Sequence, residues 1–253
     1  GTDATIALIG GADITANFRP GTMAISIGML LSALAMTWHL VHFHYVKFNK
    51  ESMYEVSKKI ILLCIPLLLS ALVHSKELLN EALDLTDTNQ ELFISMSHNI
   101  FGVLSIAIVV PILEEVLFRG AIEGHLLRKG WSPKWAILVS ALIFGIIHGN
   151  PAQIPFAFLI GLLFGWLYYR TGSLVPGIVG HIINNSFGAW TMFTATREEL
   201  SQTTMETLGT TITYILLVLA IIVFIGMYLY LNKYLPKPTN IQVKAINEQD
   251  ITI

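Results

Sequence analysis

The chain has 253 residues, of which 54% are apolar and 13% are charged, and its net charge is −2 at pH 7. A charge this close to zero gives no electrostatic basis for binding nucleic acid. The apolar residues occur in long blocks and not in amphipathic stripes, which argues against a water-soluble domain and predicts an integral membrane protein.

The apolar blocks predict an all-α fold, a polytopic transmembrane helix bundle that forms one domain over residues 1–253. One span needs about 20 apolar residues in a helix. The expected spans are Met23 to Val46, Ile60 to Val73, Asn99 to about Leu127, Trp135 to His148, Ile154 to Tyr169, Leu174 to about Thr194, and Ile212 to Leu231. These are about seven spans, and because the chain does not start with Met, we expect an eighth to precede them in the full-length protein.

Basic residues alternate from side to side along these spans. Most of them lie in the segments that join spans one and two, three and four, and five and six, and in the C-terminal tail. The other side carries few basic residues and the acidic stretch 77–91. Because cytoplasmic loops are enriched in Lys and Arg, this alternation predicts a multi-pass protein with a cytoplasmic C-terminus.

Three of the spans carry polar residues that lipid would reject. They are Glu114, Glu115 and Arg119 in span three, His148 in span four, and His181, Asn184 and Asn185 in span six. Counting from the nearest basic residue at the cytoplasmic end, the helical rise places Glu114, His148 and His181 about 16–21 Å into the bilayer. Groups on three helices at a similar depth predict one shared polar site.

Helical spacing separates the expected roles. Glu115 and Arg119 are four residues apart with the acid first, which favours an ion pair along one helix face. Glu114 is turned about 100° away, so it is free to face a cavity and take a proton from water. His181 and Asn185 share a face and can donate hydrogen bonds to a developing oxyanion. The alternatives are structural hydrogen bonds between helices and ion or proton transport.

These residues resemble the signature of the CPBP intramembrane proteases, also called the Abi or type II CAAX prenyl endopeptidase family. The family pattern Glu-Glu-x-x-x-Arg, Phe-x-x-x-His and His-x-x-x-Asn is matched by Glu114 to Arg119, by Phe144 to His148 and by His181 to Asn185. The resemblance implies an endopeptidase that hydrolyses a peptide bond in the membrane, with its catalytic core at about residues 99–195.

The resemblance also implies the role of each residue. Glu114 would activate water, His148 would help to position it, and His181 and Asn185 would form the oxyanion hole. Glu115, Arg119 and Phe144 would support them. We favour this metal-free mechanism because Asn is a poor zinc ligand, and commit to no cofactor. The sequence leaves open a zinc site made of Glu114, His148 and His181.

The expected partners are the lipid bilayer and a peptide or lipidated protein substrate at the membrane. The family includes proteases that act on prenylated tails and on bacteriocin or pheromone peptides, and nothing in the sequence chooses among such substrates. The alternative function is a non-proteolytic membrane protein on the same scaffold, for bacteriocin immunity or partner binding.

Overall fold

The structure is a computed structural model that describes residues 21–46, 61, 66, 83 and 85–235. Within these residues every regular element is a helix, which confirms the predicted all-α class. Most of the second expected span, at 60–73, lies outside the described residues, as do residues 1–20 and the C-terminal tail. The predicted number of spans is therefore not confirmed.

The first described helix is α3, Thr22–His42, and the short helix α6 follows at Gln90–Ser97. Next comes one continuous membrane-length helix, Ile100–Arg128, referred to below as the central helix. It is built from α7 Ile100–Leu104, η1 Ser105–Val109, α8 Val110–Glu115, η2 Val116–Glu123 and α9 Gly124–Arg128.

Two of these segments, η1 and η2, are π-helical, which the sequence reading did not predict. Pro111 explains the first, because a proline cannot donate a backbone hydrogen bond and its ring crowds the carbonyl of Ala107, four residues earlier. Segment η1 covers this turn. The second directly follows Glu115 and contains Arg119, and π-helical turns within α-helices are frequent at functional sites.

The next helices are α10 Pro133–Ile147, α11 Ile154–Thr171 and α12 Val175–Thr194. Each has a proline in its first turn, where no intrahelical partner is lost. Two one-turn helices, α13 Arg197–Ser201 and α14 Thr204–Leu208, lead to the long helix α15 Thr210–Tyr234.

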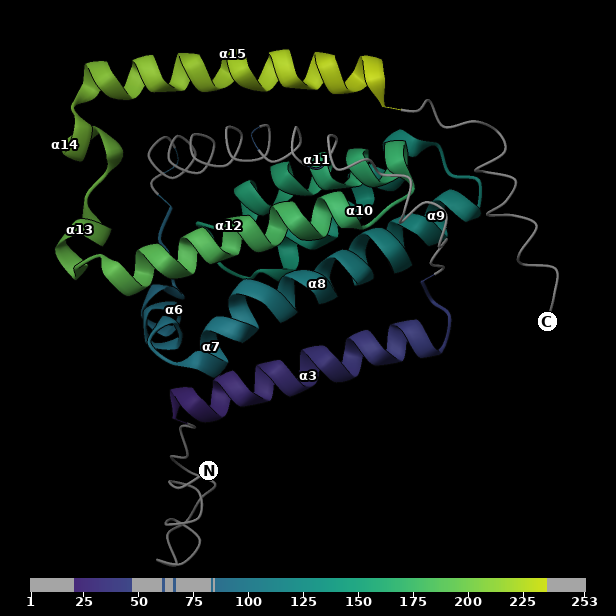
Figure 1. The fold of residues 1–253 in the computed structure, drawn as a ribbon, viewed down its shortest axis with the longest axis horizontal. Helices are drawn as coiled ribbons and strands as arrows, with labels where there is room; N and C mark the ends of the chain where they lie inside the picture. The colour runs from purple at the N-terminus through teal and green to yellow at the C-terminus, as the bar shows by residue number, and fades with distance from the viewer. Residues whose placement is uncertain (1–20, 47–60, 62–65, 67–82, 84, 236–253) are drawn as a thin grey trace, which may run out of the picture.

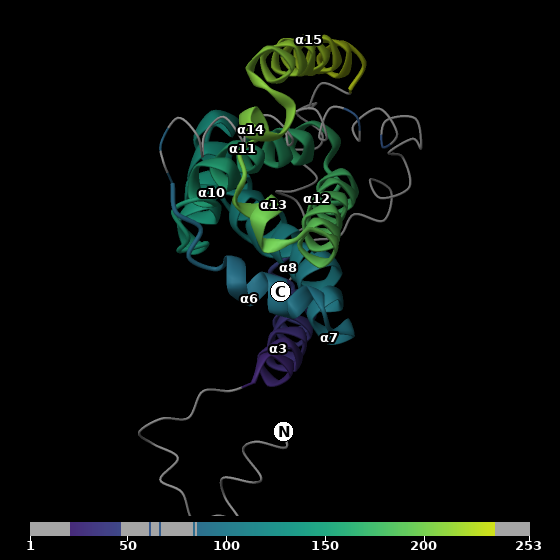
Figure 2. The same cartoon turned by 90° about the vertical axis from the view of Figure 1, so that its left-hand side faces the viewer.

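The helices pack as a bundle in which α8 and α12 lie centrally, with α3 along one side and α15 along the opposite side (Figure 1). The end-on view in Figure 2 separates α10 and α11 from α12, on either side of the central helix. Helices α10 and α11 approach closely because Gly161 has no side chain: a Cβ there would lie 3.0 Å from the Cβ of Ala141.

Four described helices are long and apolar enough to cross a membrane: α3, the central helix, α11 and α15. Helix α10 is apolar but shorter, and α12 is long enough at 20 residues but carries His181 and two asparagines. Together with the family resemblance reported below, these helices make the chain an integral membrane protein.

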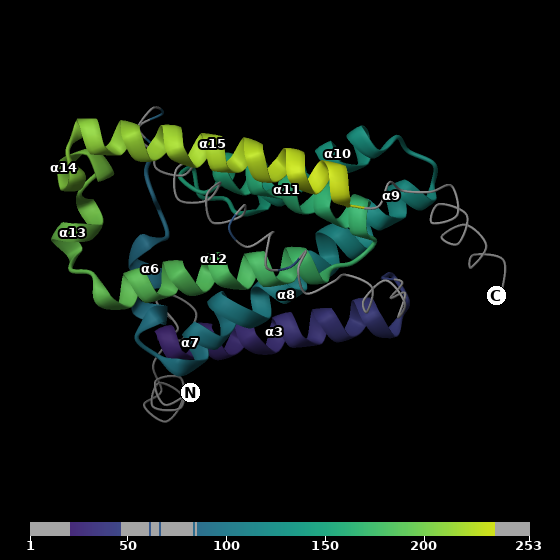
Figure 3. The same cartoon turned by 45° about the horizontal axis from the view of Figure 1, so that its top comes forward.

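Basic residues collect at one end of the bundle. Arg128 of α9 donates to the carbonyl of Tyr45 beyond α3 at 3.3 Å, and Arg170 of α11 donates to the carbonyl of Asn232 in α15 at 2.9 Å. Helices α13 and α14 lie at the other end (Figure 3). This arrangement is consistent with the expected alternation of the spans, whereas the cytoplasmic location of the C-terminus stays a prediction.

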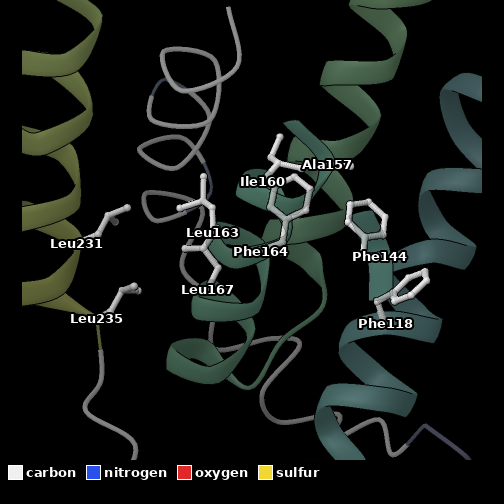
Figure 4. Close-up of a cluster of buried hydrophobic side chains, with 9 residues drawn as sticks. All are labelled: Phe118, Phe144, Ala157, Ile160, Leu163, Phe164, Leu167, Leu231 and Leu235. Carbon is white, nitrogen blue, oxygen red and sulfur yellow. The ribbon is translucent and has the colours of Figure 1, made fainter. Parts of the chain in front are cut away.

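The main apolar core links α10, α11, η2 and the end of α15. Figure 4 shows the rings of Phe118 and Phe144 next to each other, with Phe164 nearby and with Leu231 and Leu235 farther off on and just after α15. The Phe118 and Phe144 ring centroids are 5.0 Å apart in an edge-to-face arrangement. Phe144 thus anchors α10 against the central helix, directly beside the polar residues described next.

Candidate active site

A buried ion pair lies at the middle of the central helix. Arg119 Nη1 donates to Glu115 Oε1 at 2.9 Å, and both side chains are 1% exposed. This is the ion pair that the spacing predicted. Arg119 also donates to the carbonyl of Gly161 at 3.2 Å and stacks over the rings of Phe144 and Phe164, at 4.5 and 5.4 Å from their centroids. Two further helices therefore hold the guanidinium in place.

His181 of α12 connects the two glutamates. Its Nδ1 lies 3.0 Å from Glu115 Oε1, and its Nε2 lies 3.3 Å from Glu114 Oε2. Glu115 pairs with Arg119 as a carboxylate, which only accepts hydrogen bonds, so His181 Nδ1 is the donor. His181 Nε2 faces Glu114 Oε2 across the 3.3 Å between them. The sequence predicted the common site but not the contact between His181 and Glu115.

Gly177 makes this contact sterically feasible. A Cβ on Gly177 would lie 2.5 Å from Glu115 Oε2, a distance that real Cβ atoms do not tolerate. Gly177 is one turn before His181 on α12, so the missing side chain leaves room for the Glu115 carboxylate between α12 and the central helix. The spacing of Gly177 and His181 on one helix face is a signal that the sequence reading missed.

His148 directly follows the last residue of α10 and is its C-cap. Its Nδ1 lies 2.8 Å from the carbonyl oxygen of Phe144, which can only accept, so Nδ1 carries the hydrogen. In the neutral ring Nε2 is then left as an acceptor. The Phe144 ring packs edge-to-face on His148 at 4.9 Å and on His181 at 5.8 Å. The Phe144 ring therefore contacts both imidazoles.

Asn185 is fixed on both sides of its amide. Its Nδ2 donates to the carbonyl of Ile106 at 2.9 Å, and its Oδ1 accepts from Asn184 Nδ2 at 2.9 Å. An amide nitrogen carries two hydrogens, so Asn185 keeps one N–H beyond its bond to the π-helical segment η1. The two asparagines that the sequence singled out thus make different contacts, since Asn184 donates to Asn185 and Asn185 donates to the central helix.

The predicted site residues line one cavity of about 290 Å³. Glu114 enters it from the central helix, His148 from the end of α10, and His181 and Asn185 from α12. The remaining wall is mainly apolar and includes Phe93 and Phe156. The structure thus brings together all four residues expected to act directly, while Glu115 and Arg119 lie buried behind them.

The same residues fit a metal ion poorly. Within the described part of the chain, no group of three His, Cys, Asp or Glu side chains is arranged to hold one. His181, the central member of the zinc set left open by the sequence, has both nitrogens directed at glutamate oxygens. No step of the mechanism below therefore runs through a metal.

Two buried polar residues near the site were not predicted. Asn150 is fully buried and joins the α10–α11 loop to the start of α6 through a 2.7 Å bond to Asp87. Glu123 is also fully buried, and neither carboxyl oxygen has a hydrogen-bond partner among the described residues. Glu123 follows Arg119 by four residues, as Arg119 follows Glu115, so the repeated spacing was a readable signal.

Comparison with known proteins supports the resemblance that the motifs suggested. Residues 96–187 match the family described as Type II CAAX prenyl endopeptidase Rce1-like. The matched region contains every predicted site residue, from Glu114 to Asn185.

Three curated bacterial relatives match parts of the chain. The chain is 38% identical over 81 residues to the putative membrane peptidase YdiL of Bacillus subtilis. These residues are 32% of this chain and 33% of that protein. The chain is 33% identical over 106 residues to the membrane-embedded CAAX protease MroQ of Staphylococcus aureus, covering 40% and 42%. It is 30% identical over 84 residues to the UPF0177 protein YxdF of Lactococcus lactis, covering 33% and 45%.

The matches span less than half the length of each of these relatives. No solved structure matches the chain.

Proposed function

We propose that this chain is an intramembrane endopeptidase of the CPBP family that hydrolyses a peptide bond with a water activated by Glu114. The match of residues 96–187 to the type II CAAX prenyl endopeptidase Rce1-like family supports the proposal. The observation that carries the proposal is the single cavity that Glu114, His148, His181 and Asn185 line together. The proposed catalytic core is residues 99–195.

Glu114 is the proposed general base. Its side chain is 17% exposed, whereas Glu115 is fully enclosed, so of the two glutamates only Glu114 can reach a water in the cavity. His148 Nε2 is the acceptor left over after Nδ1 bonds to Phe144, and it can hold one hydrogen of that water. The second hydrogen is then directed at the Glu114 carboxylate, which sets the lone pair of the oxygen toward the substrate.

His181 and Asn185 are the proposed oxyanion donors. Asn185 has one amide hydrogen beyond its bond to Ile106, and the Asn184 amide keeps it oriented. His181 is held by Glu115 through Nδ1, which keeps its Nε2 directed into the cavity next to Glu114. Donors fixed in advance stabilise a developing negative charge without the cost of reorienting solvent.

The proposed reaction follows from these placements. The water oxygen bonds to the scissile carbonyl carbon while Glu114 takes its proton, and the carbonyl oxygen becomes an oxyanion beside His181 and Asn185. The C–N bond then breaks, and Glu114 returns the proton to the leaving nitrogen. The oxyanion re-forms its C=O bond, and the products are a new carboxylic acid and a new amine, which exchange a proton to become a carboxylate and an ammonium group. Glu114 is regenerated as a carboxylate.

The site depth and the family suggest a substrate anchored in or at the membrane. The relative MroQ, which this chain matches over less than half of its length, is described as a membrane-embedded CAAX protease. We propose the same class of substrate for this chain, a membrane-associated peptide or lipidated protein, with the C-terminus of the enzyme in the cytoplasm.

Replacing Glu114 with Gln tests the proposal. The change keeps the size of the side chain but removes the base, so cleavage of a membrane peptide pool should fall by about 10²–10⁴-fold with an unchanged unfolding transition. Glu198→Gln is the matched control, because Glu198 is an exposed residue of α13 and should tolerate the change. Unchanged cleavage in Glu114→Gln would refute the proposed role, and a function that survives this change would point to immunity or partner binding.

A further inference from the structure

The wall of the cavity changes character along α12. His181, Asn184 and Asn185 line its polar half, and Gly188, Ala189 and Met192 continue the same helix face as an apolar half. These positions recur at three- and four-residue intervals, so they form one stripe along the helix. The boundary between the halves falls at Gly188, one turn beyond Asn185.

Other helices add further apolar side chains to the wall, while Asn89 and Gln153 are polar residues that line it before α6 and α11. Ile160, Ala157 and Phe156 contribute a similar stripe from α11, while Phe93 of α6 and Met29 of α3 line the cavity as well. None of these side chains can donate or accept a strong hydrogen bond. Met29 and Met192 are flexible and can adapt to the shape of an apolar group.

Gly188 differs from the glycines that allow close packing. A Cβ on Gly177 would collide with Glu115, but a Cβ on Gly188 would meet no atom within 4 Å. A glycine inside a helix makes the helix less stable than an alanine does, and no neighbouring atom requires a glycine at position 188. Since Gly188 lines the cavity, the space that its missing side chain leaves is cavity space.

We propose, on the basis of the endopeptidase function above, that Gly188, Met192, Phe93 and Met29 form a specificity subsite for one large apolar side chain of the substrate. Gly188 is three helical residues from Asn185, a rise of about 4.5 Å. An extended peptide advances about 3.3 Å per residue. The subsite therefore receives the side chain one or two residues away from the scissile carbonyl held by Asn185.

The occupant is a peptide side chain and not a lipid chain. The cavity has about 290 Å³, at the lower end of the roughly 300–1,000 Å³ typical of small-molecule pockets. This space must also hold the scissile peptide and the attacking water. A leucine, methionine or phenylalanine side chain matches the remainder in size and polarity.

Filling the subsite from the protein side tests the proposal. The wild-type chain in detergent micelles is given a synthetic pool of membrane peptides in which the two residues on either side of each cleavable bond are varied among Ala, Leu, Met and Phe. Each peptide is supplied both with and without an attached lipid chain. Mass spectrometry of the products gives kcat/KM for each. We expect the wild type to prefer Leu, Met or Phe over Ala at one position.

In Gly188→Leu the new side chain occupies the subsite, so the ratio of kcat/KM for large over small residues at that position should fall at least tenfold. Gly188→Ala should lower it by a smaller factor. Gly226→Leu is the control, because Gly226 lies on the exposed surface of α15 and also has open space at its Cβ. Its preference should equal that of the wild type.

The outcomes separate the two proposals. If the wild type cleaves no peptide, both the proposed endopeptidase function and the proposed subsite are refuted. A wild type that cleaves, with the same preference in Gly188→Leu and Gly188→Ala, overturns the subsite alone. If Gly188→Leu is inactive toward every peptide, the kcat/KM ratio for large over small residues in Gly188→Ala tests the subsite. A ratio below that of the wild type supports the subsite, and an unchanged ratio overturns it. If the variants discriminate only against peptides with an attached lipid chain, the occupant is the lipid and the proposal is wrong.

Discussion

Helix α15 and the central helix Ile100–Arg128 are both long enough to cross a membrane, but they use their side chains differently. Of the most apolar stretch of α15, 6% is buried within the protein, against 39% for the central helix. The buried residues of α15 are Thr213, Ala220 and Leu231. Those of the central helix include Glu115, Arg119 and Glu123.

This difference shows what hydropathy does and does not specify. Helix α15 presents apolar side chains on all sides, so lipid can solvate it with few protein contacts. The central helix carries charges that lipid would reject, so each must find a partner inside the protein. The central helix therefore depends on specific neighbours, and substitutions there should have far larger effects than those on α15.

The largest effect on stability is expected for Arg119→Ala. The change leaves the Glu115 carboxylate buried without its partner, which typically costs about 3–5 kcal/mol. Unfolding titrations in mixed micelles would measure it. Leu219→Ala on α15, where Leu219 is 52% exposed, should shift stability by only about 0.5 kcal/mol. Similar losses of stability in Arg119→Ala and Leu219→Ala would contradict the difference between the central helix and α15.

A smaller loss is expected for Gly177→Ala. The added methyl would press on Glu115, which Arg119 and His181 hold in place, and overpacking of this kind costs about 1–3 kcal/mol. Cleavage should decline as well, because the contact of His181 with Glu115 is disturbed. Gly226→Ala makes the same chemical change on α15, where nothing lies near the new methyl. If Gly177→Ala is as stable as Gly226→Ala, the close packing of Gly177 against the Glu115 carboxylate is contradicted.

A weak and local effect of pH is expected at the periphery, in α13. Hydrogen bonds from the backbone N–H and the hydroxyl of Thr196 lower the pKa of Glu199. The cap therefore contributes fully above the ordinary glutamate pKa and is lost as the pH falls through the lowered one. Protection of residues 196–201 from hydrogen exchange should decrease over this acidic range. Glu199→Gln, which does not titrate, should remove the pH dependence.

Metal removal should have the smallest effect. His181 already contacts two glutamates, and Glu114, His148 and His181 do not form a three-ligand group. Treatment of the purified protein with a chelator should leave cleavage unchanged. Metal analysis of the treated protein checks that the metal has been removed. Loss of cleavage that zinc restores would require a rearrangement of these side chains and would overturn the metal-free mechanism.

Much of the site could be predicted from the sequence because the membrane makes polar residues conspicuous. The spacing of Glu115 and Arg119 predicted their ion pair, and helical rise placed Glu114, His148 and His181 at one depth. Contacts between helices were out of reach, because helix rotation and tilt depend on packing. The bond from His181 to Glu115 and the link from Asn150 to Asp87 are such contacts.

The irregular parts of the central helix were also missed. A regular 3.6-residue repeat was assumed throughout, and two π-helical stretches change which residues share a face. Pro111 signalled the first of them. Nothing in the local sequence signals the second, which contains Arg119 and its bond to the carbonyl of Gly161 on another helix.

The central claim is that groups from three helices act together on one water. The most direct test is a double-mutant cycle on cleavage with Glu114→Gln, His148→Ala and the double variant. Residues that act as one unit are not additive, so the double variant should lose about as much kcat/KM as the worse single variant. If the two losses multiply instead, Glu114 and His148 act independently and the claim of a shared water is contradicted.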